Sequence, residues 1–539
     1  MDEVDDALTY ERCESFGGGM DAFNRPTLLA PDAYQYGENT FIPDGLEVGT
    51  RPGFDSLFTA LGGKIQGLLY FDRPPPIVGD PDIEQLINVG AAKVYTWNGT
   101  LNTEQTGWTP TTSSDVMSMA QGVDKALLTD GEARSSGTVG GFRVWDGTAF
   151  TDPGNGANDP PETATILLWH ASRMWASGFP GTVAGKESDA VWGSALLDFG
   201  AGKWDGTDRN IRIGAGDGDP IMGLASLSSS HEHGFVMAVL KQNSIYLVNT
   251  DPTATFTNFT ANIGPQQVSD GIGCVGKRAF CVDGNDLLFV SPDRSFRSLA
   301  RMAGAQGQYE ISPPLSLPIQ SYVRRINWTY AHLISVKKYG EHVLFSLPLD
   351  SSTTPNYVFV WNGRLQRWVG IWSNLAAHDM EVTRFNGVHR LVIGETSGTV
   401  RRWKDFEDET DSDTYLDNSV AIPTRLWSRS LLFGEPLNDK DAFHLELRFG
   451  SSDASVVRIT LYADNASLKT WTENIAQPGL TLPLSLPFDL ANPQYASRLK
   501  GLRGLNPFNE MYLRVESTAG WWRLRTISIS AFLNTLKTQ

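Results

Sequence analysis

The chain has 539 residues, of which 41% are hydrophobic and 19% charged, and this composition excludes a largely disordered protein. Its net charge is −17 and its basic residues cluster only in pairs such as Arg324-Arg325, which excludes tight, sequence-independent binding of nucleic acid. The three cysteines, Cys13, Cys274 and Cys281, are too few for a disulfide framework. We expect buried free thiols and folding in a reducing cytosol; the alternative is that Cys274 and Cys281 face each other across a hairpin.

Residues 1–50 are predicted to form an N-terminal arm and an opening segment. Residues 1–15 are acidic and have no apolar core, so they predict a short arm and not a secretory signal. No later stretch approaches the roughly 20 apolar residues that span a bilayer, so no membrane-spanning segment is expected. The sequence Arg51-Pro52-Gly53-Phe54 closes the opening segment.

Residues 51–405 repeat one pattern, in which a short apolar run leads into a tight turn. Asn-Gly and Asp-Gly are strong hairpin signals because both residues accept a positive φ. Four such turns follow a tryptophan: Trp97-Asn98-Gly99, Trp145-Asp146-Gly147, Trp204-Asp205-Gly206 and Trp361-Asn362-Gly363. Further expected strand pairs are Gly234–Val239 with Ser244–Val248, Ala279–Val282 with Asp286–Val290, and His342–Leu347 with Tyr357–Trp361. Such recurring pairs predict a β-propeller of six or seven blades, because stacked blades bury each other's faces. A series of unrelated β-sandwiches is the alternative.

Residues 406–420 are predicted to be a solvated acidic linker, and residues 421–539 a separate C-terminal β-sandwich. The densest acidic run of the chain, Asp405–Asp413, marks this boundary. The strand candidates beyond it are Pro423–Phe433, Phe443–Phe449, Val456–Tyr462, Tyr512–Glu516 and Trp522–Ile529. The predicted fold class is therefore all-β.

Candidate chemistry is sparse, and no catalytic, cofactor-binding or metal-binding residue is nominated. His231-Glu232-His233 places two imidazoles on one face of a strand but has no third ligand nearby, which favours a polar loop over a metal site. Gly214–Pro220 offers carboxylates to a hard cation, but its residue order favours a tight loop between strands. Ser228-Ser229-Ser230 does not form a nucleophile elbow. We therefore expect a protein that is not an enzyme.

Three stretches of the chain carry a resemblance to a known family. The first runs from Phe16-Gly17-Gly18-Gly19-Met20-Asp21 through Asn39 to Arg51-Pro52-Gly53-Phe54. The second comprises Ile211–Gly214, Asp217–Leu224 and Lys241–Tyr246, and the third comprises Gly271–Val275 and Phe289–Leu299. In this order they resemble the tail hub or nozzle proteins of short-tailed bacteriophages, also called packaged-DNA stabilisation proteins. The resemblance covers about residues 16–400.

The resemblance implies a structural protein of the virion tail, assembled in the host cytoplasm and without a cofactor. Such a protein forms a hexameric ring below the portal-adaptor, extends the DNA channel, helps to retain the packaged genome and allows its ejection into the host. The implied partners are further copies of the chain, the tail adaptor, a tail fibre or spike, and plug proteins. Double-stranded DNA is expected to pass through the lumen without tight binding, because an acidic wall repels phosphate.

Two other functions stay open at this point. A carbohydrate-binding or glycan-cleaving β-propeller involved in host recognition predicts converging carboxylates or exposed tryptophans at the propeller mouth. A cytosolic scaffold predicts a monomer that forms no ring. Tryptophans at equivalent turns are expected to pack between blades, which favours a structural role over a stacking surface.

Overall fold

The computed structural model describes residues 8–43, 47–74, 82–111, 116–135, 137–181, 186–204, 210–228, 235–250, 265–284, 286–303, 313–405, 412–434, 439–449, 456–475, 496–502 and 507–533. Strands dominate these residues, so the prediction of an all-β protein is confirmed, whereas the propeller and the sandwich stay predictions. The described helices are α2 (Leu299–Ala303) and α3 (Gln320–Val323) with the 3-10 helices η1 (Pro26–Leu28), η2 (Leu317–Ile319), η3 (Trp328–Leu333), η4 (Phe385–Gly387) and η5 (Ser412–Tyr415). None of these helices is long and apolar enough to cross a membrane.

The described residues between 54 and 403 form seven small antiparallel sheets, here numbered in chain order. Sheets 1 and 2 contain β7 (Ile65–Arg73), β8 (Ile83–Gly90), β9 (Lys93–Trp97) and β10 (Asn102–Gln105), then β11 (Ser118–Gly122), β12 (Lys125–Thr129), β13 (Phe142–Trp145) and β14 (Phe150–Thr151). Sheets 3 and 4 contain β15 (Ile166–His170), β16 (Arg173–Ser177), β17 (Ala190–Gly193) and β18 (Asn210–Arg212), then β19 (Ile221–Ser228), β20 (Phe235–Lys241), β21 (Ser244–Asn249) and β22 (Gln266–Asp270). Sheet 5 contains β23 (Phe280–Asp283), β24 (Asp286–Ser291) and β25 (Ser295–Ser298). Sheets 6 and 7 contain β26 (Ser335–Tyr339), β27 (His342–Leu347), β28 (Tyr357–Asn362) and β29 (Arg367–Ser373), then β30 (Ala377–Thr383), β31 (Arg390–Glu395), β32 (Val400–Trp403) and β6 (Phe54–Ser56).

The predicted hairpins are confirmed wherever the structure describes them. The turns after Trp97, Trp145 and Trp361 join β9 to β10, β13 to β14 and β28 to β29. The Asn98 side chain accepts hydrogen bonds from the backbone amides of Thr100 and Leu101, at 3.1 and 2.9 Å, which fixes the turn locally. The three strand pairs expected without a preceding tryptophan turn also form. The turn after Trp204 lies outside the described residues.

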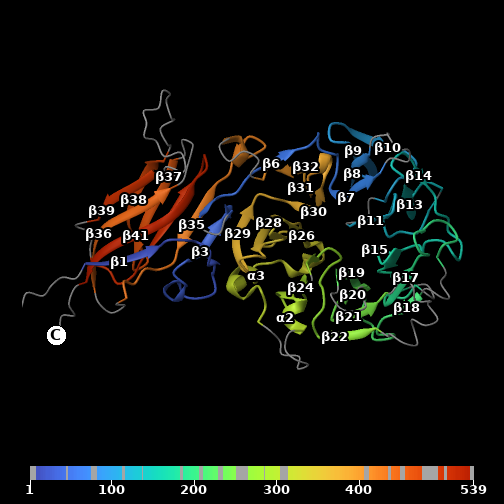
Figure 1. Cartoon of the computed structure of the whole chain (residues 1–539), viewed down its shortest axis with the longest axis horizontal. Helices are drawn as coiled ribbons and strands as arrows, with labels where there is room; N and C mark the ends of the chain where they lie inside the picture. Colours follow the sequence, from blue (N-terminus) through green and yellow to red (C-terminus); the bar gives the residue numbers. More distant parts are fainter. Residues whose placement is uncertain are drawn as a thin grey trace, which may run out of the picture.

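The seven sheets are packed side by side in sequence order. Their first strands, β7, β11, β15, β19, β23, β26 and β30, contact one another in that order, and β30 also contacts β7. Figure 1 shows the sheets arranged around these first strands. The strand β6 precedes sheet 1 in the sequence, yet it pairs with β32 and completes sheet 7. Sheet 7 therefore contains a strand that precedes all the strands of sheet 1 in the sequence.

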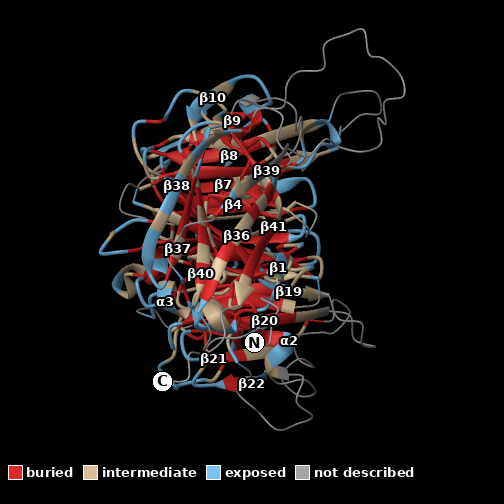
Figure 2. Cartoon of the chain, turned by 90° about the vertical axis from the view of Figure 1, so that its left-hand side faces the viewer, coloured by how far each residue is buried: buried red, intermediate tan, exposed pale blue. Residues whose placement is uncertain are grey.

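Apolar layers lie between neighbouring sheets, and successive side chains of one strand feed two of them. On β12, Leu127 packs between sheets 2 and 3, whereas Leu128 packs between sheets 1 and 2. On β16, Met174 packs between sheets 2 and 3, whereas Trp175 packs between sheets 3 and 4. Because both faces of these sheets are covered, the strands read as continuous apolar runs and not as alternating ones. Figure 2 shows that the outermost strand β10 is instead largely exposed.

Strands from both ends of the chain form two more layers. One sheet has the order β39-β36-β41-β5-β4, with β1 on β41, and the other continues sheet 6 in the order β29-β3-β35-β40-β37-β38, with β2 on β3. Their bounds, with the small pair β33 and β34, are β1 (Leu8–Cys13), β2 (Gly19–Met20), β3 (Ala33–Glu38), β4 (Thr40–Phe41), β5 (Val48–Thr50), β33 (Leu416–Asp417), β34 (Val420–Ala421), β35 (Thr424–Ser428), β36 (Lys440–Phe449), β37 (Val456–Ala463), β38 (Ala466–Asn474), β39 (Ala496–Gly501), β40 (Met511–Ser517) and β41 (Arg523–Leu533). Buried and half-buried residues alternate along β40, as a sheet covered on one face requires.

The described parts of the predicted arm and linker are ordered segments that pack against other strands. Residues 8–13 form β1, and all six of them pair with residues of β41. Residues 412–417 form η5 and β33, where Tyr415 is buried and stacks on Trp521 with ring centroids 4.5 Å apart. The C-terminal layers therefore include N-terminal strands, and residues 421–539 do not build them alone. Residues 1–7 and 406–411 lie outside the described residues.

Candidate functional site

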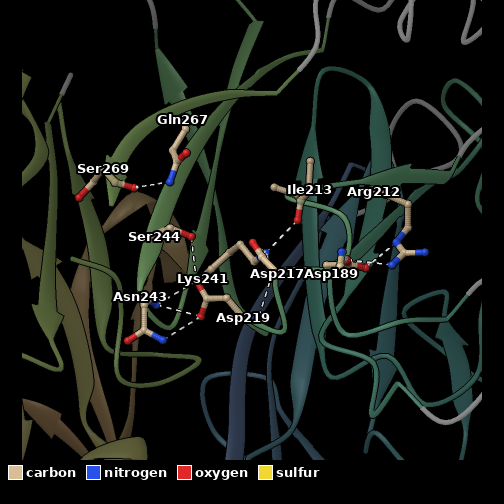
Figure 3. A network of polar contacts seen from close by, with 11 residues as sticks. Asp189, Arg212, Ile213, Asp217, Asp219, Lys241, Asn243, Ser244, Gln267 and Ser269 are labelled. Carbon is tan, nitrogen blue, oxygen red and sulfur yellow. Dashed lines mark hydrogen bonds and ion pairs between the residues drawn. The ribbon is translucent and has the colours of Figure 1, made fainter. Parts of the chain in front are cut away.

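The first candidate is the Gly214–Pro220 loop, whose carboxylates are engaged by protein donors. Lys241 donates to both carboxylate oxygens of Asp217, at 2.7 and 2.6 Å, and to the carbonyl oxygen of Ile213 at 2.9 Å. Asp219 accepts hydrogen bonds from the backbone amide of Asn243 at 3.0 Å and the Ser244 hydroxyl at 2.8 Å (Figure 3). The loop is therefore a clasp between sheets 3 and 4, as the expected tight loop between strands required.

Asp189 extends this clasp on the sheet 3 side. Its carboxylate accepts two hydrogen bonds from Arg212, at 2.5 and 2.8 Å, and one from the backbone amide of Gly216 at 3.1 Å (Figure 3). Burial raises the pKa of Asp189, but these hydrogen bonds outweigh burial and hold the pKa below its ordinary value. The carboxylate is thus a charged structural group and not a general acid.

The clasp makes a stability prediction. The Lys241 side chain is fully buried, so Lys241→Met leaves the Asp217 carboxylate without its counter-charge, and we expect a loss of about 2–4 kcal/mol in the free energy of unfolding. The control is Lys93→Met, which removes an exposed ion pair with Glu104 at 2.8 Å and should leave the free energy of unfolding nearly unchanged. Urea unfolding curves of the two variants measure the difference, and equal losses would mean that the clasp contributes nothing beyond a surface pair.

His170 ties sheets 3 and 4 together at a second point. Its Nδ1 lies 2.7 Å from the Ser226 hydroxyl and its Nε2 lies 2.6 Å from the Thr250 hydroxyl. Burial lowers the pKa of His170 from 6.5 to about 4, because the charged imidazolium would lose its hydration.

The lowered pKa of His170 predicts acid sensitivity. Between pH 6.5 and pH 4 the unfolded chain binds a proton that the folded chain does not, so stability falls as the pH is lowered through this window. The full shift corresponds to about 3 kcal/mol. We expect His170→Gln to lose less stability than the parent protein between pH 7 and pH 4, with the exposed His332→Gln as control. Identical pH profiles for parent and His170→Gln would contradict a neutral, buried imidazole.

The second candidate is a cavity of about 530 Å³ at the centre of the seven sheets, here called the axial cavity. Every sheet contributes a residue of its first strand: Leu68, Met119, Leu167, Leu224, Cys281, Lys337 and Glu381 are examples in chain order. Basic side chains outnumber acidic ones in the lining. The basic residues are Lys277, Arg278, Lys337 and Lys338, and the acidic residues are Asp379 and Glu381. This is a positive site within an acidic protein.

Arg278 lines the axial cavity and reaches several sheets. Its guanidinium donates to the carbonyl oxygens of Gln66, Met117 (3.2 Å) and His378 (3.1 Å), which belong to sheet 1, the lead-in to sheet 2, and sheet 7. It also lies 3.4 Å from the Asp379 carboxylate. One side chain from the start of sheet 5 thus connects segments of three other sheets.

Three lysines also line the cavity. Lys337 donates to both carboxylate oxygens of Glu381 at 2.9 Å. Burial lowers the pKa of Lys337, but the Glu381 carboxylate outweighs burial and raises it. Lys338 pairs with Asp283 at 2.5 Å. For Lys277, burial and the neighbouring Arg278 charge lower the pKa, and no described carboxylate lies within ion-pair distance of its ammonium.

The third candidate is the junction between sheet 6 and the C-terminal layers. Asn39, at a positive φ of 53°, donates its backbone amide to the Ile371 carbonyl at 2.8 Å. Its side-chain oxygen accepts from the Ser373 amide at 2.9 Å, and its side-chain amide donates to the Pro423 carbonyl at 2.8 Å. A single asparagine therefore joins β29 to the segment that leads into β35.

Arg51 continues the junction. Its guanidinium makes two parallel hydrogen bonds to Asp417, at 3.0 and 2.6 Å, and a third to the Asn39 side chain at 3.2 Å. It also stacks between the rings of Phe54 and Trp372, at 5.6 and 5.5 Å from their centroids. The side chain is 1% exposed. The motif Arg51-Pro52-Gly53-Phe54 therefore has a structural role, because its arginine and phenylalanine hold the junction together.

The features weighed for chemistry do not gather into a catalytic or metal site in the described part of the chain. The histidines of His231-Glu232-His233 and the serines Ser229 and Ser230 lie outside the described residues. Among the residues that are described, no three His, Cys, Asp or Glu side chains are placed to hold a metal ion. The three cysteines are free and buried, as expected, and burial raises the pKa of each thiol to about 12.

The tryptophans are structural, as the turn positions predicted. Of the sixteen, twelve are buried and Trp169, Trp328, Trp427 and Trp471 are half-buried, so none presents an exposed ring for stacking on a sugar or base. The Trp145 indole illustrates their role, because it reaches from sheet 2 to donate to the Gln85 side chain of sheet 1 at 3.0 Å.

Sequence reasoning missed Arg278, Lys277, Lys241 and Asn39 as site residues. The partners of Arg278 and Asn39 lie far away in the chain. Lys241 is marked by one sequence signal, a single basic residue in an apolar run. Comparisons with protein-family models and with curated proteins found no match for the chain.

Proposed function

We propose that the seven sheets form a seven-bladed β-propeller and that the flanking strands form a β-sandwich docked on it. Three observations support the propeller. The first strands contact one another in order and β30 returns to β7, apolar layers separate neighbouring sheets, and β6 completes the last sheet with a strand from the start of the array. The two layers that share strands from both chain ends support the sandwich.

The proposed function is that of a tail nozzle or hub subunit of a short-tailed bacteriophage. In this role, six copies form a ring below the portal-adaptor, extend the DNA channel, help to retain the genome and allow its ejection. The observation that carries the proposal is the location of the residues behind the resemblance. The first stretch of the resemblance, from Phe16 to Phe54, contains Asn39 and Arg51 and forms the junction. The second, which includes Asp217–Leu224 and Lys241–Tyr246, forms the clasp around Lys241. The third docks on the clasp, because the Cys274 amide donates to the Lys241 carbonyl at 2.9 Å.

These positions suit a protein whose work is mechanical. Each stretch fastens one part of the molecule to the next, and neither the clasp nor the junction presents an unpaired carboxylate to a substrate. A subunit held together in this way keeps one shape while neighbouring subunits pack against it. The surface that forms the ring would then be a single interface repeated between copies.

The DNA channel in this proposal is the lumen of the ring. A cavity of about 530 Å³ lined in part by Arg278 is far too small for duplex DNA, so the path cannot run through the centre of one subunit. The net charge of −17 supports a lumen that lets DNA slide without binding it. The expected partners remain the adaptor, a tail fibre or spike, and plug proteins.

Electron microscopy of the purified protein tests the proposal directly. We expect six-fold rings, formed by the chain alone or on the adaptor as a template. Light scattering gives the subunit number independently, and fluorescence anisotropy with a labelled duplex should detect no tight binding at physiological salt. A monomer in the presence of the adaptor would overturn the tail assignment.

The glycan-directed alternative has no observation in its favour. The two carboxylates of the axial cavity, Asp379 and Glu381, face Arg278 and Lys337 as counter-charges, and no tryptophan is exposed. A glycan array and a hydrolysis assay on the purified protein separate this alternative from the structural role.

A further inference from the structure

We propose that the axial cavity binds a small oxyanion, a phosphate or a carboxylate group, and that Lys277 holds its charge. This inference concerns the interior of one subunit and holds whether or not the subunit belongs to a phage tail. It rests on the charges of the cavity wall, their partners and the volume they enclose.

The charges of the cavity wall do not balance. Three of its four basic side chains have a carboxylate within ion-pair distance, as Arg278 has Asp379 at 3.4 Å and Lys337 has Glu381 at 2.9 Å. Lys338 is satisfied from outside the lining by Asp283. The four basic side chains have three carboxylate partners among the described residues, so one positive charge is left without a counter-charge. That charge is on Lys277.

An uncompensated ammonium in this place is costly for the folded protein. Lys277 is half-buried, and the next residue in the chain is Arg278. Its ammonium has therefore lost hydration and has a like charge as its neighbour. The Arg278 guanidinium is already committed to the carbonyl oxygens of Met117 and His378 and cannot turn away. A bound anion would supply the missing opposite charge.

The cavity also has the dimensions and walls of a binding site for a small molecule. Its volume of about 530 Å³ lies within the range of small-ligand pockets, roughly 300–1,000 Å³. Leu68, Met119 and Leu224 supply apolar surface beside the charged groups. Apolar walls strengthen an ion pair by lowering the local dielectric constant, so one lysine can suffice for a small oxyanion.

Thermal unfolding with added anion tests this site. The parent protein is titrated with inorganic phosphate and, separately, with acetate, while sodium chloride keeps the ionic strength constant. We expect a saturable rise of the melting temperature with one or both anions, and the stronger response identifies the preferred group. Lys277→Met should weaken the apparent affinity by about tenfold or more, the loss of one charge-assisted hydrogen bond, whereas Lys277→Arg should retain it.

Two further measurements keep the test sharp. Lys93→Met removes a surface lysine and should leave the anion response unchanged. In anion-free buffer, Lys277→Met should melt no lower than the parent, because it removes a charge without a partner. The proposal is overturned by a parent protein without a saturable response to either anion, by an unchanged response in Lys277→Met, or by a lower melting temperature of that variant without anion.

Discussion

Replacing Arg278 with methionine is expected to lower the free energy of unfolding by about 3–5 kcal/mol, because it leaves the buried Asp379 carboxylate without its counter-charge. The carbonyl oxygens of Gln66, Met117 and His378 lose a donor at the same time. Arg278→Lys should recover less than half of the loss, because one ammonium cannot replace a planar guanidinium that serves several carbonyls. Urea unfolding followed by tryptophan fluorescence measures both variants.

A surface arginine provides the control for this prediction. Arg364 pairs with Glu341 at 3.0 Å, and both side chains are about half exposed. Arg364→Met should therefore change the free energy of unfolding by no more than about 1 kcal/mol. If Arg278→Met were as mild as Arg364→Met, the guanidinium in the cavity wall would not connect the sheets energetically.

Arg51→Met is expected to cost a similar amount, about 3–5 kcal/mol, because it removes the partner of Asp417 at the junction. The stacking on Phe54 and Trp372 is lost as well. Arg51→Lys should restore little, since lysine cannot form the two parallel bonds to Asp417. Limited proteolysis should then show faster cleavage between the seven sheets and the C-terminal layers than in the parent protein.

Two further variants define this effect. Arg325 makes an equally regular pair with Asp350, at 2.8 and 2.6 Å, but on the surface, so Arg325→Met should be mild and should not change proteolysis. Gly53→Ala should be as damaging as Arg51→Met, because a β-carbon at Gly53 would lie 1.9 Å from the Leu416 carbonyl oxygen. An unaltered Gly53→Ala protein would show that the two segments are not locked together at this point.

The sequence predicted what depends on neighbours in the chain. The turn after Trp97 depends on Asn98, whose side chain accepts hydrogen bonds from the backbone amides of Thr100 and Leu101. The pair His342–Leu347 with Tyr357–Trp361 is a local hairpin. The burial of the tryptophans followed from their repeated turn positions. The tight loop at Gly214–Pro220 was predicted from its residue order alone.

Pairings over long distances were not predictable in the same way. Nothing around Glu38 announces that β3 lies parallel to β29, more than 300 residues later, or that residues 8–13 pair with β41. Acidic composition suggested a solvated linker where Asp417 in fact neutralises Arg51. Lys277 and Arg278 look like an ordinary basic pair, because the sheets that surround them are assembled from the whole chain.

The strand β6 has a consequence for how the chain is made. Its partner β32 begins at Val400, so the ribosome must add about 340 residues before β6 can pair, which takes roughly 20–70 s at usual synthesis rates. During that time β6 presents an open strand edge, as does β1, which waits for β41 at the other end of the chain. Neither β1 nor β6 can therefore be covered by its final partner strand until most of the chain has been made.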